Sequence, residues 1–129
     1  MLIGLLISVI DDDPSVRESL PDLLRQLGYT VQTFLSAEDF LQSARVGETR
    51  CLILDIALPG MSGLELPREL DRRGHNIPII FITALEDDTV RDRVLSQGAV
   101  ECLFKPFCEA DLIKALDSAI PVNNTKLER

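Results

Sequence analysis

The sequence has few of the residues from which zinc sites are built. It contains a single histidine, His75, and three cysteines, Cys51, Cys102 and Cys108, none of them in a CxxC pair. Zinc sites need clustered cysteine and histidine ligands, so a zinc site is not expected. The three cysteines are instead predicted to be small buried hydrophobic side chains in a reducing compartment.

Positive charge is also scarce. Thirteen Lys and Arg stand against 21 Asp and Glu, which gives a formal net charge of −8. Contacts to nucleic-acid phosphates require cationic side chains, so direct nucleic-acid binding by this domain is not expected. An acidic surface of this kind suits metal ions or the basic surface of a partner protein.

The sequence lacks a long hydrophobic run. The opening stretch MLIGLLISVI is ten residues long, about half of what a helix needs to cross a bilayer. No Lys or Arg precedes it and no small-residue cleavage site follows it, which disfavours a signal peptide. We expect a buried strand there, no membrane association and a cytoplasmic location.

What is present is the composition of one globular domain. The chain has 129 residues, of which 46% are apolar and 26% charged, and this is enough for a single hydrophobic core. We assign residues 1–121 to one domain. The polar stretch 122–129 is expected to be a tail, and the start of a linker to an output domain is the alternative interpretation.

Apolar strand-like runs alternate with helical patterns five times along the chain. The predicted strands cover residues 5–10, 29–34, 51–55, 77–83 and 99–104. The first predicted helix starts at Pro14 behind an Asp13 cap and closes at Gly28, the second is capped by Ser36, and the others cover residues 64–73, 86–97 and 109–120. Short apolar strands alternating with helices predict an α/β fold, in which helices cover both faces of a parallel sheet in a three-layer sandwich.

Polar side chains are predicted to meet at one edge of this sheet. Asp11 and Asp12 follow the first strand, Asp55 ends the third, Thr83 ends the fourth and Lys105 follows the fifth. The carboxyl ends of parallel strands lie on the same edge, where such sheets bind ligands. Taken singly, each residue has an ordinary explanation, such as a solvated loop, a strand end or a surface lysine. Their common position favours a functional site.

Clustered carboxylates need a compensating positive charge. Mg²⁺ or Mn²⁺ takes oxygen ligands, and Mg²⁺ typically bridges one or two carboxylates to a phosphate. Lys105 adds a further positive charge, and Thr83 can donate a hydrogen bond to a phosphoryl oxygen. A metal-bound aspartate beside a lysine is suited to attack phosphorus and to hold the product. Asp13 is assigned to capping the first helix.

Four motifs occur in a characteristic order: VIDDD (residues 9–13), LILDIALPGMSG (52–63), IIFITA (79–84) and FKPF (104–107). In order and spacing they resemble the receiver domain of two-component response regulators. The stretch AEDFL that follows the second strand is similar to the FixJ group. The resemblance implies a flavodoxin-like (CheY-like) fold, with a five-stranded parallel sheet in the order 2-1-3-4-5 and five helices.

The resemblance also implies a phosphoacceptor and a metal site. Asp55 would accept a phosphoryl group from the phosphohistidine of a sensor histidine kinase, in a reaction that depends on Mg²⁺. Asp12, Asp55 and the backbone carbonyl of Ala57 would bind the metal, and Asp11 would act through water or as support.

Further roles are implied for the ends of the fourth and fifth strands. Lys105 would pair with the phosphoryl group and be followed by a cis bond to Pro106, and Thr83 would be the switch hydroxyl. The family usually has an aromatic residue three positions before the lysine, where this sequence has Cys102. The aromatic half of the switch is therefore missing from its usual place.

The function implied is a phosphorylation-controlled switch, which acts catalytically only on its own aspartate and is not a conventional enzyme. Its output would be a DNA-binding transcription regulator or a partner protein, and the face formed by the fourth helix, fifth strand and fifth helix is a candidate homodimer surface. Two alternatives stay open. One is a degenerate receiver that serves as an interaction module. The other is an aspartyl-phosphate phosphohydrolase, which usually needs a second carboxylate where this chain has Ala57.

Overall fold

One parallel sheet forms the centre of the molecule. The computed structural model describes residues 5–58, 60–84 and 87–120. The strands are β1 (Leu6–Ile10), β2 (Thr30–Phe34), β3 (Thr49–Asp55), β4 (Ile79–Thr83) and β5 (Glu101–Phe104). They pair in the order β2-β1-β3-β4-β5, and every pairing is parallel. The predicted fold class and strand order are confirmed.

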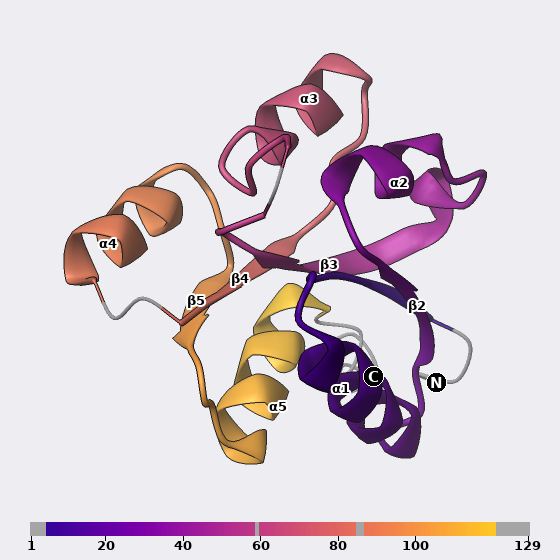
Figure 1. Ribbon diagram of the computed structural model, residues 1–129, viewed down its shortest axis with the longest axis vertical. Helices are drawn as coiled ribbons and strands as arrows, with labels where there is room; N and C mark the ends of the chain where they lie inside the picture. Colours follow the sequence, from indigo (N-terminus) through magenta and orange to yellow (C-terminus); the bar gives the residue numbers. More distant parts are fainter. Residues whose placement is uncertain (1–4, 59, 85–86, 121–129) are drawn as a thin grey trace, which may run out of the picture.

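Helices cover both faces of the sheet. They are α1 (Pro14–Gln26), α2 (Ala37–Gln42), α3 (Leu66–Arg72), α4 (Asp88–Ser96) and α5 (Glu109–Ala119). Figure 1 shows α1 and α5 on one face and α2, α3 and α4 on the other. A short 3-10 helix, η1 (Val46–Glu48), precedes β3 and was not predicted from the sequence.

The alternation of side chains along the strands fills two cores. On β1, Ile7 and Val9 join the core under α1 and α5, whereas Ile10 joins the core under α2, α3 and α4. Successive side chains of a strand point to opposite faces, so a strand between two helical layers must be apolar at nearly every position. This explains why the central strands read as continuous apolar runs.

Side-chain caps define where three helices begin. The carboxylate of Asp13 accepts a hydrogen bond from the N–H of Ser15 at 3.0 Å, and the hydroxyl of Ser36 accepts one from the N–H of Asp39 at 3.1 Å. Asp87 caps α4 in the same way. Each cap satisfies an N–H group that has no partner within its helix. The predicted capping roles of Asp13 and Ser36 are confirmed.

Some predicted boundaries are wrong. The fourth strand begins at Ile79 and not at residue 77, because Pro78 has no N–H group to donate to the sheet. The third strand begins earlier than predicted, at Thr49. The fourth helix begins at Asp88; Glu86, where it was predicted to start, lies outside the described residues, as does the tail at 122–129.

The cysteine prediction holds for two of the three residues. Cys51 and Cys102 are buried, with exposed fractions of 0% and 3%. Cys108 is exposed. It occupies the N-cap position of α5, where the chain has already left the sheet, so no core surrounds it.

This difference predicts how the thiols react. In the native protein, one thiol per chain should react quickly with a disulfide reagent, and all three should react after denaturation. Burial raises the pKa of Cys51 to about 12 and also raises that of Cys102, and only the thiolate is nucleophilic. Reagent absorbance over time measures the two phases. Cys108→Ser should remove the fast phase, and a fast phase that survives this change would contradict the assignment.

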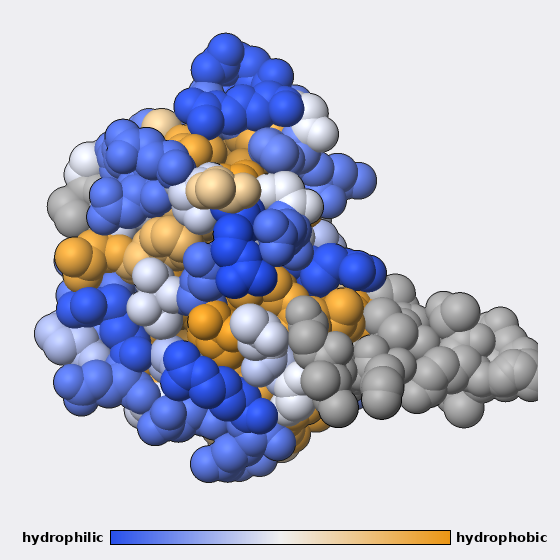
Figure 2. Space-filling model, turned by 90° about the vertical axis from the view of Figure 1, so that its right-hand side faces the viewer, coloured by the Kyte–Doolittle hydropathy of each residue, from blue (hydrophilic) through white to orange (hydrophobic). Residues whose placement is uncertain are grey.

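Hydrophilic side chains cover much of one face of the molecule. The side that lies at the right of Figure 1 faces the viewer in Figure 2, where hydrophilic side chains separate the apolar areas. None of the helices in the described ranges has the length and apolar character that a membrane crossing requires.

Candidate functional site

The predicted site residues lie at the carboxyl edge of the sheet. Asp11 directly follows β1, Asp55 is the last residue of β3 and Thr83 is the last residue of β4. Lys105 follows β5, and its backbone N–H donates to the carbonyl of Thr83 at 2.7 Å. The sequence prediction that these segments meet at one edge agrees with the structure.

Three carboxylates gather there. Asp11, Asp12 and Asp55 each offer an oxygen, and these oxygens all lie within 4.8 Å of one another. Asp11 and Asp55 are buried, whereas Asp12 is exposed. The cluster is therefore open to solvent on the side of Asp12 and enclosed on the side of the sheet.

Lys105 supplies the positive charge of the cluster. Its Nζ lies 2.9 Å from Oδ2 of Asp11 and 3.3 Å from Oδ2 of Asp55. The side chain of Lys105 is 16% exposed and that of Asp11 is fully buried. One ammonium group thus faces two carboxylates, which leaves negative charge in excess.

Burial and this excess of negative charge both raise the pKa of Asp55. Burial raises the pKa of Asp55 and the charge of Asp11 adds to the rise, while the Ala57 N–H and Lys105 oppose it. Burial alone would lower the pKa of Lys105, but its contacts with the two carboxylates outweigh burial and raise it. Lys105 therefore stays protonated, and the ionised form of Asp55 stands to gain from a further cation.

The turn after β1 holds Asp11 in place. Its Oδ1 accepts a hydrogen bond from the N–H of Asp13 at 2.8 Å. Its Oδ2 is buried and faces the ammonium group of Lys105 at 2.9 Å. A buried carboxylate is costly unless a cation pairs with it, and Lys105 is that partner for Asp11.

These donors fit Mg²⁺ or Mn²⁺. All three side chains offer hard oxygen ligands within 4.8 Å of one another, and two further features agree: the exposure of Asp12, which leaves room for water ligands, and the excess of negative charge that one ammonium group leaves. Mg²⁺ typically keeps several waters and binds through one or two carboxylates. Asp11, Asp12 and Asp55 are thus the residues that could hold the ion.

The loop after β3 packs closely on Asp55. The N–H of Ala57 donates to Oδ1 of Asp55 at 3.0 Å, and the N–H of Gly63 donates to the carbonyl of Ile56 at 3.2 Å. A Cβ on Gly63 would lie 2.5 Å from the carbonyl oxygen of Asp55. Sequence reasoning assigned no role to Gly63, because a glycine in a turn motif does not reveal which backbone it approaches.

The end of β5 contacts the end of β4. Thr83 pairs with Phe104, and Phe81 pairs with Cys102. Thr83 and Cys102 are each 3% exposed. Cys102 and Phe104 belong to the same core, under α4. Cys102, which stands where the resemblance predicted an aromatic residue, therefore lies in the interior, on the face of the sheet that α2, α3 and α4 cover.

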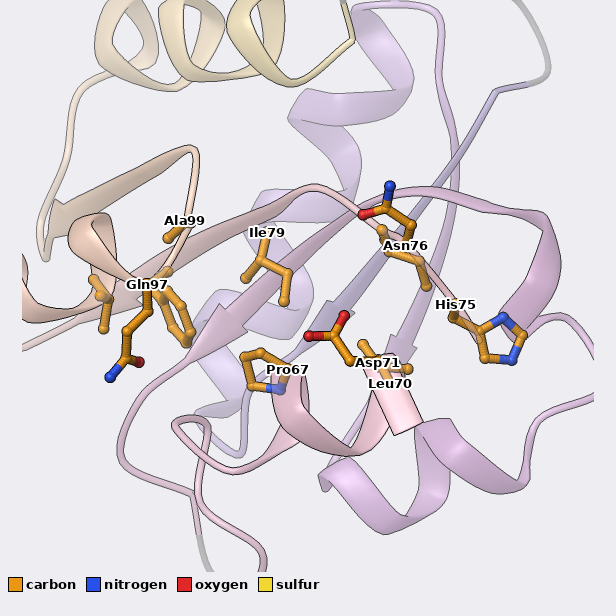
Figure 3. A pocket seen from close by; sticks show the side chains of 12 residues that line it. Pro67, Leu70, Asp71, His75, Asn76, Ile79, Gln97 and Ala99 are labelled. Atoms are coloured by element: carbon orange, nitrogen blue, oxygen red, sulfur yellow. The ribbon is translucent and has the colours of Figure 1, made fainter. Parts of the chain in front are cut away.

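A separate cavity of about 240 Å³ lies between α3 and α4. Figure 3 shows Gln97 and His75 at its two sides, with Ile79 and Ala99 between them. Ile79 begins β4 and Ala99 precedes β5, so this cavity is at the amino ends of the strands. It is distinct from the carboxylate cluster, which lies at their carboxyl ends.

Comparison with known proteins agrees with this geometry. The family model of the response regulator receiver domain matches residues 7–117. Nodulation protein W of Bradyrhizobium diazoefficiens is 44% identical over 114 residues, which cover 88% of this chain and 50% of that protein. The transcriptional regulatory protein FixJ of Azorhizobium caulinodans is 38% identical, with 88% of this chain and 54% of that protein covered.

A solved structure shares the fold. The response regulator StyR superimposes with a TM-score of 0.82 at 42% identity, over 95% of this chain and 62% of that one. The chain spans about half the length of the curated relatives that it matches. Because the family model matches residues 7–117, which is most of its length, the chain belongs to the response regulator receiver domain family.

Proposed function

We propose that the chain is a phosphorylation-controlled switch whose phosphoacceptor is Asp55. The observation that carries the proposal is the meeting of three carboxylates and Lys105 at one sheet edge. The donor would be the phosphohistidine of a sensor histidine kinase. An oxygen of Asp55 attacks phosphorus, the new O–P bond forms, and the P–N bond to the histidine breaks with the electron pair leaving on nitrogen.

The residues of the site would divide the work. Asp11, Asp12, Asp55 and the carbonyl of Ala57 would hold Mg²⁺ or Mn²⁺, which supplies charge neutralisation for the phosphoryl oxygens when it is bound. The Ala57 N–H and the turn after β1 orient the carboxylates before reaction. Lys105, already beside Asp55, would pair with the phosphoryl group and balance its charge.

Phosphorylation would be read out through Thr83 and the strand beside it. A charged group on Asp55 gives the Thr83 hydroxyl a new acceptor, which biases the protein towards a second conformation. Thr83 is paired with β5, and Cys102 takes the place of the usual aromatic there. The change would reach the face formed by α4, β5 and α5.

That face is the proposed surface for output. A groove there is lined by Arg91, Lys114, Glu101 and Asp111, with Phe107 among the apolar residues. Side chains of both charges and an apolar floor suit a second copy of the chain or a partner domain. We propose a DNA-binding output domain or partner protein as the target, with no direct nucleic-acid contact by this domain, and a cytoplasmic location.

Phosphoryl labelling tests the proposal. With acetyl phosphate and Mg²⁺, the intact mass of the chain should rise by one phosphoryl group per molecule, and EDTA should prevent this. Turnover of a phosphate ester, with many equivalents of phosphate released per chain, would support the phosphohydrolase alternative instead. A correctly folded chain that takes up no label would support the interaction-module alternative.

A further inference from the structure

We infer that Glu38 of α2 positions the loop between β3 and α3 for metal binding, an inference that rests on the proposed function. Oε2 of Glu38 accepts a hydrogen bond from the backbone N–H of Met61, with an N···O distance of 2.9 Å. Glu38 and Met61 are 23 residues apart in the chain. The bond therefore links two separate elements on the same face of the sheet (Figure 1).

The loop is held at three places. Near its start, the Ala57 N–H donates to Asp55, and near its end the Gly63 N–H donates to the carbonyl of Ile56. Glu38 holds the part between them. The side-chain acceptor Asp55 belongs to the strand that the loop directly follows, whereas Glu38 reaches the loop from a helix 23 residues away in the chain.

Gly60 shows how closely the carboxylate approaches the loop. Its φ is +73°, and a Cβ at this position would lie 2.8 Å from Oε2 of Glu38. The carboxylate thus rests directly on the backbone of the turn, and a side chain at Gly60 would displace it. Position and hydrogen bond together make Glu38 a support for this turn.

The chain that leads into α2 also contacts the segment that carries Asp11. The carbonyl of Phe34, at the end of β2, accepts the N–H of Asp11 at 3.1 Å. Ser36 caps α2 two residues later. The stretch from Phe34 to Glu38 therefore contacts the backbone at Asp11, within the carboxylate cluster, and at Met61, in the loop that follows Asp55. Glu38 acts as a positioning residue, since it is not among the grouped carboxylates.

Three variants separate this role from a simple change of charge. Glu38→Ala, Glu38→Gln and Asp39→Ala each remove one negative charge from the first turn of α2. Glutamine keeps an oxygen that can accept from Met61, whereas alanine does not. Asp39 is exposed, and its side chain makes no hydrogen bond in the described part of the chain, so it provides the matched control.

Two measurements are made on each variant. In EDTA, the Met61 amide should exchange with deuterium about tenfold faster in Glu38→Ala than in the wild type and in Asp39→Ala, because its acceptor is lost. By titration calorimetry, the dissociation constant for Mg²⁺ should be about fivefold higher in Glu38→Ala than in Glu38→Gln. This loss of affinity is smaller than that for removing a direct partner of a metal ligand, about 10-fold or more, because Met61 is not itself a ligand.

The outcomes distinguish this inference from the proposed function. If the wild type binds no Mg²⁺ and takes no label, the proposed function fails. If the wild type binds Mg²⁺ but Glu38→Ala matches Glu38→Gln in affinity, the inference on Glu38 is overturned. Unchanged exchange at Met61 in Glu38→Ala would overturn it as well, and thermal melts in EDTA check that all three variants are folded.

Discussion

Asp55→Asn is expected to take up no phosphoryl group from acetyl phosphate under conditions that label the wild type fully. An amide is not a nucleophile comparable to a carboxylate, and the other carboxylates of the cluster have different surroundings. Asp11 is fully buried against Lys105, and Asp12 is exposed and has no ion pair with Lys105 among the described contacts. Intact mass with and without Mg²⁺ measures the result.

The same variant should be more stable than the wild type when metal is removed. Burial raises the pKa of Asp55, so the ionised carboxylate destabilises the folded state at neutral pH, and this cost declines as the pH falls through the folded-state pKa. We expect a gain of about 1 kcal/mol in the free energy of unfolding in EDTA, the common size of a single-site effect. Mg²⁺ should then stabilise the variant less than the wild type.

Asp71→Asn is the matched control, because Asp71 is an exposed aspartate of α3 outside the cluster. It should be labelled like the wild type and show the wild-type response to Mg²⁺ in urea titrations. Equal labelling of Asp55→Asn and the wild type would move the acceptor to another residue. A loss of stability in Asp55→Asn without metal would contradict the account of an overcharged cluster.

Gly63→Ala should destabilise the chain strongly. The new Cβ would lie 2.5 Å from the carbonyl oxygen of Asp55 and 2.9 Å from Cα of Ile56. Both are backbone atoms, one in the last residue of β3 and one in the residue after it, and neither can rotate away as a side chain can. We expect a loss of about 3 kcal/mol in the free energy of unfolding, at the upper end of overpacking effects, together with reduced labelling of a displaced Asp55.

Gly47→Ala provides the control for Gly63→Ala. A Cβ at Gly47 would have His75 Cε1, at 3.8 Å, as its nearest neighbour, which is an ordinary contact. Urea unfolding should therefore place Gly47→Ala within about 1 kcal/mol of the wild type. If Gly63→Ala is as stable as Gly47→Ala, the close packing of the loop on Asp55 is not a constraint in solution.

The order of the elements could be predicted because local patterns report burial directly. The apolar stretches of β1 and β3 must be covered on two faces, and Asp13 and Ser36 mark where helices begin. The residues at which strands begin and end were predicted less accurately. Residue 77 was expected in β4 on its apolar character, but Pro78 prevents the backbone pairing that would extend the strand.

Contacts between elements could not be predicted from local sequence patterns. Cys108 has the same chemical character as Cys51, and only its place outside the sheet leaves it exposed. Glu38 resembles any acidic residue in the first turn of a helix until its bond to Met61 is seen. Gly63 resembles any turn glycine until its distance to Asp55 is known.

Local sequence patterns were enough to predict the fold class, and four motifs were enough to indicate the family. They also predicted that three carboxylates, a hydroxyl and a lysine lie close together, because strand ends in a parallel sheet share one edge. The distribution of charge follows from tertiary packing, which sets Lys105 between Asp11 and Asp55. Tertiary packing also decided which neighbours hold the loop after β3. Distances of a few ångströms between residues far apart in the chain depend on how helices pack on the sheet, and no local spacing encodes them.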